Sequence, residues 1–324
     1  NSAERGGGLY GTGRQSIMDC IACLNSAEAG GGMYLDGAGA RNCLVYGNAG
    51  GGGAGGVACV SGAGLADSVV TNNTTTGLGG GVSASLASTV TNCVISGNSA
   101  ASGGGVGVLA AGVVVHCRID NNSASAFGGG VYFSEGGSLN VCTVMSNTTA
   151  YGRGGGAYVH LQGTITGGTI ADNTASNGGG VYCYSGGLVS SATLARNRAD
   201  TGGGAFFHSG GVLSNALVKG NYARQGGGVY SATTYGTMFT SKLHDNVAGE
   251  QGGALYSTTG GIYVRSCELA GNTASNAGGG AYWLNAYSWM WLENSSVASN
   301  HAPHAGGVYA AGAGTLMNTI VYHN

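Results

Sequence analysis

Charged side chains are scarce in this sequence, and their scarcity limits the partners that the chain can bind. Asp, Glu, Lys and Arg together make up only 7% of the 324 residues, and the formal net charge is −2. No run rich in Lys or Arg occurs, so the chain lacks the positive patch with which proteins bind nucleic acids or anionic membranes. We therefore expect no nucleic-acid partner.

Long apolar runs are also lacking. No stretch of 18 apolar residues occurs, so the sequence predicts no membrane-spanning helix and no direct membrane insertion. Residues 1–20 lack the apolar core of a secretion signal. The chain opens on Asn1-Ser2-Ala3-Glu4, which closely repeats Asn25-Ser26-Ala27-Glu28. We expect that any signal has been removed or was never included.

Glycine is the most conspicuous residue that is present. It supplies 69 residues, while proline supplies one. A glycine-rich chain of low charge can be disordered, but disordered chains lack the 17 Tyr and the regular Val, Ile and Leu seen here. With 43% apolar residues, the chain has enough material for a core.

One pattern repeats along the whole chain at a mean spacing of about 25 residues. Each unit contains an apolar residue, two variable residues and an Asn, followed some residues later by a glycine triplet and a second apolar residue. From Asn1 to Asn324 the pattern recurs in thirteen intervals. We expect these Asn side chains to form a hydrogen-bonded ladder with one rung per repeat: Asn25, Asn48, Asn73, Asn98, Asn122, Asn147, Asn173, Asn197, Asn221, Asn246, Asn272 and Asn300.

Alternating apolar residues within each unit predict strands rather than helices. The residue after the glycine triplet and the residue two positions later should both point inward, as in Val131 and Phe133. A second inward pair precedes each Asn, as in Cys93 and Ile95. Stacked in register, such units bury a continuous core. The sequence predicts an all-β, right-handed parallel β-helix of about thirteen coils with three short strands per coil, forming one domain over residues 1–324.

The repeat also resembles a known family. The pairing of Asn92-Cys93-Val94-Ile95-Ser96-Gly97-Asn98 with Gly103-Gly104-Gly105-Val106 resembles the repeats of chlamydial polymorphic outer-membrane proteins and the wider pectin-lyase-like β-helix group. The chlamydial repeats usually have Phe before the Asn, where this chain has Val, Ile or Leu. The resemblance covers essentially the whole chain and implies an exported, surface-associated, often adhesive β-helix.

An aromatic residue lies between the two inward positions in ten of thirteen coils. We expect this position to face outward, and two interpretations of the aromatic residues are open. Rings stacked at the spacing of the coils can stabilise the fold, or they can form an exposed strip that binds a glycan chain or another rod. From residue 132 onward the strip is unbroken, and its members are Tyr132, Tyr158, Tyr182, Phe206, Tyr230, Tyr256, Tyr282 and Tyr309.

All three tryptophans fall in one irregular coil, residues 282–292. Tyr and Trp are favoured anchors at protein interfaces, so this coil could be a protruding contact site. Core filling of a widened coil is an equally strong interpretation. The residues concerned are Trp283, Tyr287, Trp289 and Trp291.

Nine cysteines are present, and six of them share one inward phase with Ser, Ala and Gly residues of other coils. We interpret this position as a column of buried small residues. Cys20 and Cys23 form a lone C-x-x-C, which is weak evidence for a metal or redox site. Acidic residues number only 13, without the clustered carboxylates of polysaccharide-cleaving β-helices. We expect no metal, no cofactor and no catalytic residue, and therefore no enzyme.

The chain begins and ends within a repeat, and no polar cap is visible in the sequence. We expect either a slice of a longer surface protein or subunits that associate end to end or laterally. The leading hypothesis is an exported structural or adhesive solenoid, extracellular or on the cell surface. A carbohydrate-binding β-helix that uses the Tyr strip is the first alternative, and a polysaccharide lyase or hydrolase is the second.

Overall fold

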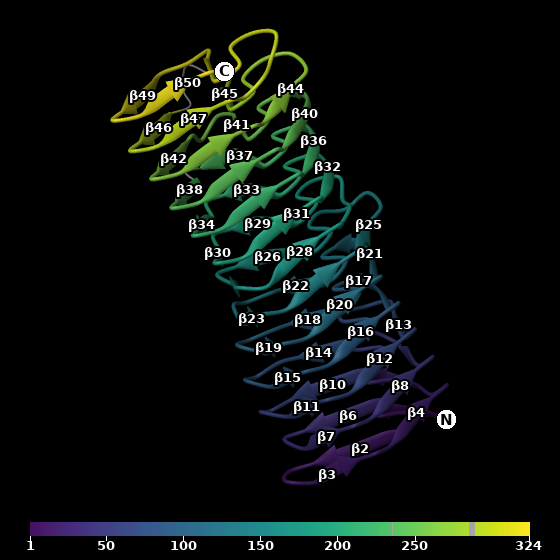
Figure 1. Ribbon diagram of the computed structural model, residues 1–324. Coiled ribbons are helices and arrows are strands. Elements are labelled where there is room, and N and C mark those ends of the chain that lie inside the picture. The colour runs from purple at the N-terminus through teal and green to yellow at the C-terminus, as the bar shows by residue number, and fades with distance from the viewer. Residues whose placement is uncertain (235, 285–288) are drawn as a thin grey trace. The chain divides into compact units, whose positions relative to one another are not determined.

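The chain folds as an all-β parallel solenoid of about thirteen coils (Figure 1). The structure is a computed structural model, and it describes residues 1–234, 236–284 and 289–324. Over these ranges no helix is long and apolar enough to cross a membrane. The β-helical fold class and the coil number predicted from the repeat are confirmed.

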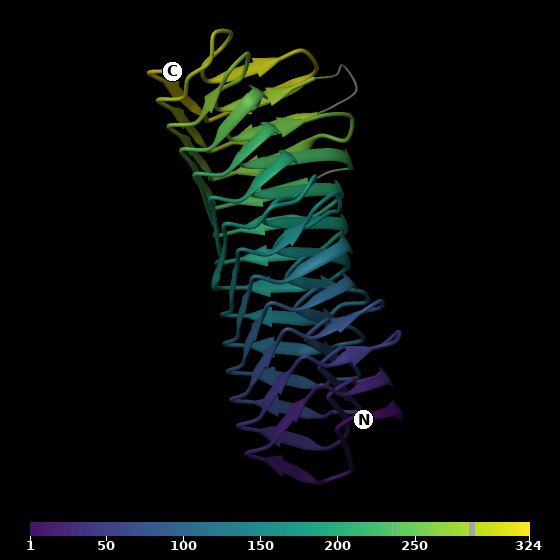
Figure 2. The same cartoon turned by 90° about the vertical axis from the view of Figure 1, so that its right-hand side faces the viewer.

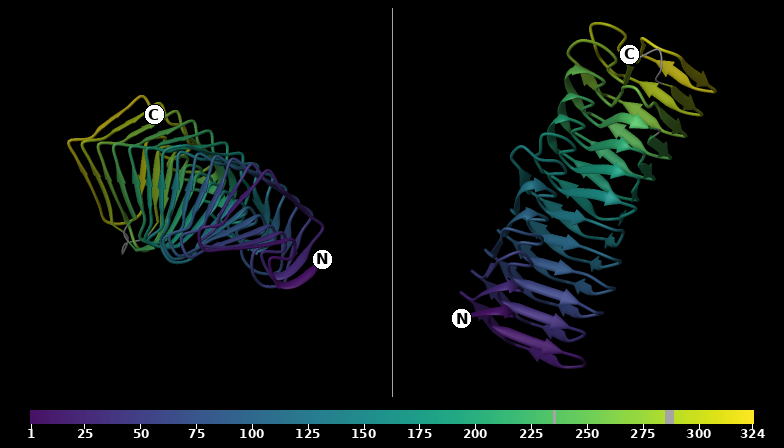
Figure 3. Two further views of the ribbon diagram at one scale, coloured as in Figure 1. Left: turned by 90° about the horizontal axis from the view of Figure 1, so that it is seen from below. Right: turned by 180° about the vertical axis from the view of Figure 1, so that it is seen from behind.

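The residues form two compact units, Asn1–Gly168 and Thr169–Asn324, which are described separately below. In each unit, every strand pairs in parallel with the equivalent strand of the next coil, and these pairings form rows that can be followed in Figures 2 and 3. We number the rows by their order after the glycine triplet. Sheet 1 follows the triplet, sheet 2 comes next, sheet 3 precedes the ladder Asn and sheet 4 follows it.

Unit 1 contains all four sheets. Sheet 1 consists of β2 (Leu9–Thr12), β6 (Met33–Asp36), β10 (Val57–Val60), β14 (Val82–Ala84), β18 (Val106–Val108), β22 (Val131–Phe133) and β26 (Ala157–Leu161). Sheet 2 consists of β3 (Ser16–Met18), β7 (Gly39–Arg41), β11 (Gly64–Ala66), β15 (Thr89–Thr91), β19 (Val113–Val115), β23 (Ser138–Asn140) and β27 (Thr164–Thr166). Sheet 3 consists of β4 (Ile21–Cys23), β8 (Leu44–Tyr46), β12 (Val69–Thr71), β16 (Val94–Ser96), β20 (Arg118–Asp120) and β24 (Thr143–Met145). Sheet 4 consists of β1 (Ser2–Arg5), β5 (Ser26–Ala29), β9 (Ala49–Gly50), β13 (Thr74–Thr75), β17 (Ser99–Ser102), β21 (Ser123–Phe127) and β25 (Thr148–Thr149).

Unit 2 repeats the arrangement. Its sheet 1 consists of β29 (Val181–Ser185), β33 (Ala205–Ser209), β37 (Val229–Thr234), β41 (Leu255–Ser257), β45 (Ala281–Trp283) and β48 (Val308–Ala310). Its sheet 2 consists of β30 (Leu188–Ser190), β34 (Val212–Ser214), β38 (Gly236–Phe239), β42 (Ile262–Arg265), β46 (Met290–Glu293) and β49 (Gly314–Met317). Its sheet 3 consists of β28 (Thr169–Ala171), β31 (Thr193–Ala195), β35 (Leu217–Lys219), β39 (Lys242–His244), β43 (Glu268–Ala270), β47 (Ser296–Ala298) and β50 (Ile320–Tyr322). Its sheet 4 consists of β32 (Arg198–Thr201), β36 (Tyr222–Gln225), β40 (Val247–Gln251) and β44 (Thr273–Ala274).

The expected inward positions form the core. Val131 and Phe133 of β22 and Ile95 of β16 are fully buried, and Leu139 of β23 is 1% exposed. Coils pair in register, so that Val106 lies beside Val131. Each inward side chain therefore packs against its equivalent in the neighbouring coil, which is what a strict repeat permits.

The Asn ladder is confirmed in both units. Asn73 donates its backbone N–H and its Nδ2 to Oδ1 of Asn98, at 2.9 and 3.0 Å. A second hydrogen on Nδ2 reaches the carbonyl of Val45 in the preceding coil at 3.0 Å. Each buried amide thus bonds to the Asn of the next coil and to a strand carbonyl of the preceding coil, which is what burial of a polar side chain requires.

The glycine triplet has three different requirements, one for each glycine. Gly103 adopts a left-handed φ of 61°. A Cβ on Gly104 would collide with the carbonyl oxygens of Ser123 and Gly129 in the next coil, and a Cβ on Gly105 would lie 2.9 Å from the ladder amide of Asn122. Both the conformation and the close approach predicted from the sequence are confirmed, at successive positions.

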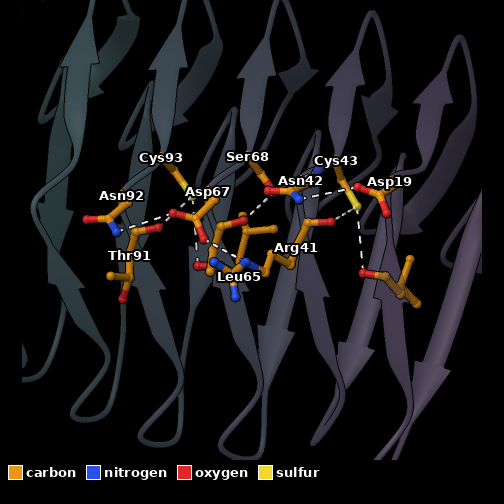
Figure 4. A network of polar contacts seen from close by, with 12 residues as sticks. Asp19, Arg41, Asn42, Cys43, Leu65, Asp67, Ser68, Thr91, Asn92 and Cys93 are labelled. Carbon is orange, nitrogen blue, oxygen red and sulfur yellow. Dashed lines mark hydrogen bonds and ion pairs between the residues drawn. The ribbon is translucent and has the colours of Figure 1, made fainter.

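Five of the six cysteines of the column are buried as expected, while Cys20 is partly exposed, and the column also forms hydrogen bonds. Figure 4 shows the column in unit 1, where Cys43, Ser68 and Cys93 occupy successive coils. Ser68 Oγ accepts from the backbone N–H of Cys43 at 3.0 Å and donates to the carbonyl of Ala66 at 2.6 Å. The position therefore selects a small side chain, and the Ser and Cys members also accept a hydrogen bond from the preceding coil. All nine cysteines are free thiols, and burial raises the pKa of Cys59 and Cys183 to about 12.

A left-handed residue marks the corner between sheets 2 and 3 in each coil. Asn and Asp often occupy it, as in Asn42, Asp67 and Asn92, and these side chains tolerate positive φ. Figure 4 shows them on the outside of the corner, where Asn92 donates to Asp67 at 3.3 Å. Val141 occupies the same corner with a φ of 52°, which is unfavourable for a β-branched residue.

Replacing Val141 by Asn should stabilise the protein. The side chain is 55% exposed, so little packing is lost, and relief of the left-handed strain should raise the free energy of unfolding by about 1 kcal/mol. Urea denaturation measures the change. Val94→Asn is the matched control, because Val94 is also partly exposed but lies in a strand, where Asn should be neutral or destabilising. A Val141→Asn variant no more stable than the parent would contradict the strain argument.

Candidate functional site

The aromatic residues of sheet 1 form stacked columns. In unit 2 six rings follow one another from Tyr182 to Tyr309, with centroids 4.7 to 5.2 Å apart and interplanar angles of 7 to 18°. In unit 1, Tyr132 stacks on Tyr158 at 5.5 Å and 8°. The stacking predicted from the repeat is present, because strand pairing in register places each ring over the next.

The expectation that this strip is exposed is wrong for most of its members. The exposed fraction is 3% for Tyr158, 2% for Tyr182, 7% for Phe206, 3% for Tyr256 and 7% for Tyr282, while Tyr132, Tyr230 and Tyr309 are partly buried.

The cover over these rings comes from the segment between the ladder Asn and the glycine triplet. Phe127, at the end of β21, contacts Tyr158 at a centroid distance of 4.7 Å. Ala277 packs with Tyr256 and Tyr282 in a buried cluster. Burial, reinforced by Tyr230 and Tyr282, raises the pKa of Tyr256 to about 12.

Where the strip lacks a ring, the covering segment supplies a larger side chain instead. Gly107 has no side chain at the aromatic position, and a Cβ there would lie 2.7 Å from the Leu78 side chain. Leu78 precedes a glycine triplet, so a large apolar residue of the cover fills the space that a ring occupies in other coils. The columns are therefore packed as an outer apolar layer. Their ring faces are occupied by neighbouring rings, which leaves no face for a ligand within the stack.

The tryptophan coil divides into a buried and an exposed part. Trp283 is 1% exposed, and its Nε1 donates to the carbonyl of Gly312 at 3.1 Å, so it fills the core rather than a contact site. Trp289 and Trp291 are 57% and 40% exposed. Tyr287 lies outside the described residues. The interface interpretation is therefore wrong for Trp283, and it stays a prediction for Trp289 and Trp291.

Trp289 and Trp291 form a pocket with two residues from the preceding coil. A pocket of about 280 Å³, which we call the aromatic pocket, is lined by Ile262, Tyr263, Trp289 and Trp291. It lies on the outer face of sheet 2, where Tyr263 of β42 pairs with Trp291 of β46. The two rings meet edge to face at 6.3 Å and 71°, and Phe239 of β38 meets Tyr263 at 6.0 Å and 69°.

Charged groups flank the aromatic pocket along the same strands. Arg265 follows Tyr263 by two residues, and its Nε lies 3.9 Å from Oε2 of Glu293. The Tyr263 hydroxyl donates to the same carboxylate, and this bond raises the pKa of Tyr263. Glu293 thereby ties together β42 and β46 and orients the Tyr263 ring.

A groove follows on the other side of this ion pair. The groove has a volume of about 610 Å³ and runs over four coils at the corner between sheets 2 and 3 of unit 2. We call it the corner groove. Lys242 and Glu268 form an ion pair of 3.2 Å within it. Its lining consists mainly of small polar residues: Thr240, Ser241, Lys242, Ser266, Cys267, Glu268, Asn294, Ser295, Ser296, Asn318 and Ile320.

Sequence reasoning missed Phe239 and Tyr263. Both occupy outward positions of short sheet 2 strands. The equivalent positions of unit 1 carry no aromatic residue; in β15 they are Thr89 and Thr91. An aromatic residue at an outward position in adjacent coils was the available signal. Across the described residues, no three His, Cys, Asp or Glu side chains come close enough to hold a metal ion.

Comparisons with protein families, curated proteins and solved structures found no match for this chain.

Proposed function

We propose that this chain is an exported structural and adhesive β-solenoid that attaches to cell surfaces through the aromatic pocket and the corner groove of unit 2. The observation that carries the proposal is the exposure of Trp289 and Trp291 beside Tyr263. Trp and Tyr are enriched among the residues that contribute most to binding, and contiguous exposed apolar patches are typical of contact sites.

The scaffold is suited to an adhesive role. In each unit the strands and the ladder Asn side chains form hydrogen bonds with the next coil. Few backbone N–H and C=O groups therefore remain unpaired and exposed to water. The resemblance of the repeat to chlamydial polymorphic outer-membrane proteins supports export and a surface location. We propose no catalytic activity for the chain.

Cell binding tests the proposal. The purified chain is labelled and its binding to a panel of cultured cells is measured, with the variant Trp289→Ser/Trp291→Ser beside it. We expect the double variant to bind about tenfold more weakly or worse, because two exposed anchors are removed. Both side chains face outward, so the β-sheet circular dichroism should not change.

Tyr151→Ser is the matched control, since Tyr151 is a 94% exposed aromatic residue of unit 1 and is not among the residues that line the aromatic pocket. Its cell binding should equal that of the parent. Equal binding by the parent and the double tryptophan variant would overturn the proposal. Sedimentation of both proteins measures their state of association, and it therefore separates cell binding from lateral self-association through the same surface.

A further inference from the structure

We infer that the ligand of this surface is an uncharged glycan, of which one sugar ring packs in the aromatic pocket while the hydroxyl groups of its further sugars bond in the corner groove. The inference rests on the proposed function and deepens it by naming the ligand class. Three features of the described residues carry it: the orientation of the rings, the pairing of the charges and the spacing of the polar groups.

Ring orientation is the first feature. A sugar ring binds an aromatic side chain by laying its C–H face on the ring face, so a free face is required. In the sheet 1 columns parallel stacking covers the faces. In the aromatic pocket the rings meet edge to face, at 69° and 71°. Because Trp289 and Trp291 are also exposed, ring faces are open to a ligand here.

Charge pairing is the second feature. Three aromatic walls could also hold a quaternary ammonium group by cation–π attraction. Here, however, Arg265 lies beside Tyr263, where it would repel a cation. Glu293 and Glu268 would likewise repel a polyanion. The two ion pairs, Arg265–Glu293 and Lys242–Glu268, leave the surface without net charge, which favours an uncharged ligand that hydrogen-bonds to both signs.

The spacing of the polar groups is the third feature. Thr240, Ser266, Asn294 and Asn318 occupy the same corner in four successive coils of the groove. Adjacent coils repeat at about 4.8 Å, which is close to the length that one pyranose adds to an extended glycan. A glycan lying along the groove would thus meet one hydroxyl or amide per sugar. The affinity should rise with chain length until the four coils are occupied.

Oligosaccharide titration tests the ligand class. Neutral β-1,4-linked glucose and N-acetylglucosamine oligomers of increasing length are titrated against the whole chain, and tryptophan fluorescence is followed. We expect saturable binding that tightens with length. Trp291→Ser should weaken it about tenfold, Trp291→Phe should retain most of it, and Tyr151→Ser should not change it. Choline and a uronic-acid polymer should not compete.

Cell binding after enzymatic treatment separates this inference from the proposed function. Loss of binding when cell-surface glycans are removed, with retention after protease treatment, supports the inference. If binding requires Trp291 but survives glycan removal and is lost with protease, the ligand is a protein; the glycan inference fails and the adhesive function stands. Binding only to uronic-acid polymers would overturn the inference as well. If the tryptophan variants bind cells as the parent does, the proposed function itself fails.

Discussion

Replacing Asn221 by alanine should lower the free energy of unfolding by about 4 kcal/mol, because each unsatisfied buried polar group costs about 1 to 3 kcal/mol. Its Oδ1 accepts from the backbone N–H and the Nδ2 of Asn197, at 2.9 and 3.0 Å. Its Nδ2 donates to the carbonyl of Leu194 and to Oδ1 of Asn246, both at 2.9 Å. Alanine removes all four bonds and leaves their partners buried.

Urea denaturation of the parent and the variant measures this loss. Asn276→Ala is the matched control in unit 2, because its side chain is exposed and water replaces any bond that is removed. That variant should change stability by less than about 0.5 kcal/mol. If Asn221→Ala were as stable as Asn276→Ala, the ladder would contribute little, and buried water would be satisfying the freed groups.

Replacing Gly104 by alanine should destabilise unit 1 by about 3 kcal/mol or more, through overpacking. The new Cβ would lie well inside the 3.0 Å below which real Cβ atoms are essentially never found, against the carbonyl oxygens of Ser123 and Gly129. Both obstacles are backbone atoms, so no side-chain rotation relieves the clash. The strand pairing between adjacent coils would have to open.

Gly39→Ala distinguishes this clash from the general effect of losing a glycine. Gly39 lies in sheet 2 of the same unit without positive φ, and a Cβ there would meet nothing within 4 Å. Alanine at that position should be neutral or stabilising by up to about 1 kcal/mol, because it restricts the unfolded chain. Thermal unfolding followed by circular dichroism compares the two variants. Similar melting temperatures would contradict the close-approach argument.

Much of the fold was predictable because the repeat is strict. Apolar residues such as Val131 and Phe133 alternate in every coil, and alternation in a strand directly assigns the faces. The ladder was predictable for the same reason, since a polar residue at one phase of a stacked repeat meets its own copies. Sheet 4 was missed. Its inward column consists of small residues such as Ala124 and Ala223, which carry little apolar signal.

The burial of the aromatic strip could not be predicted from alternation. Alternation places Tyr158 and Tyr256 on the outer face of sheet 1, and this placement is correct. Whether an outer face meets water depends on what folds over it. The covering segment lies before the next glycine triplet, with residues as different as Leu78, Phe127 and Ala277. No single residue type marked it as a cover.

The sequence by itself determined the repeat, the inward and outward faces, and the concentration of tryptophan in one coil of this protein. These properties are local, because they follow from spacing along the chain. Only the tertiary structure decided which aromatic residues are open to a partner. It buried Trp283, left Trp289 and Trp291 exposed, and placed them against Tyr263 from the coil before. The physical reason is that exposure and proximity depend on neighbouring coils, which pair residues more than twenty positions apart.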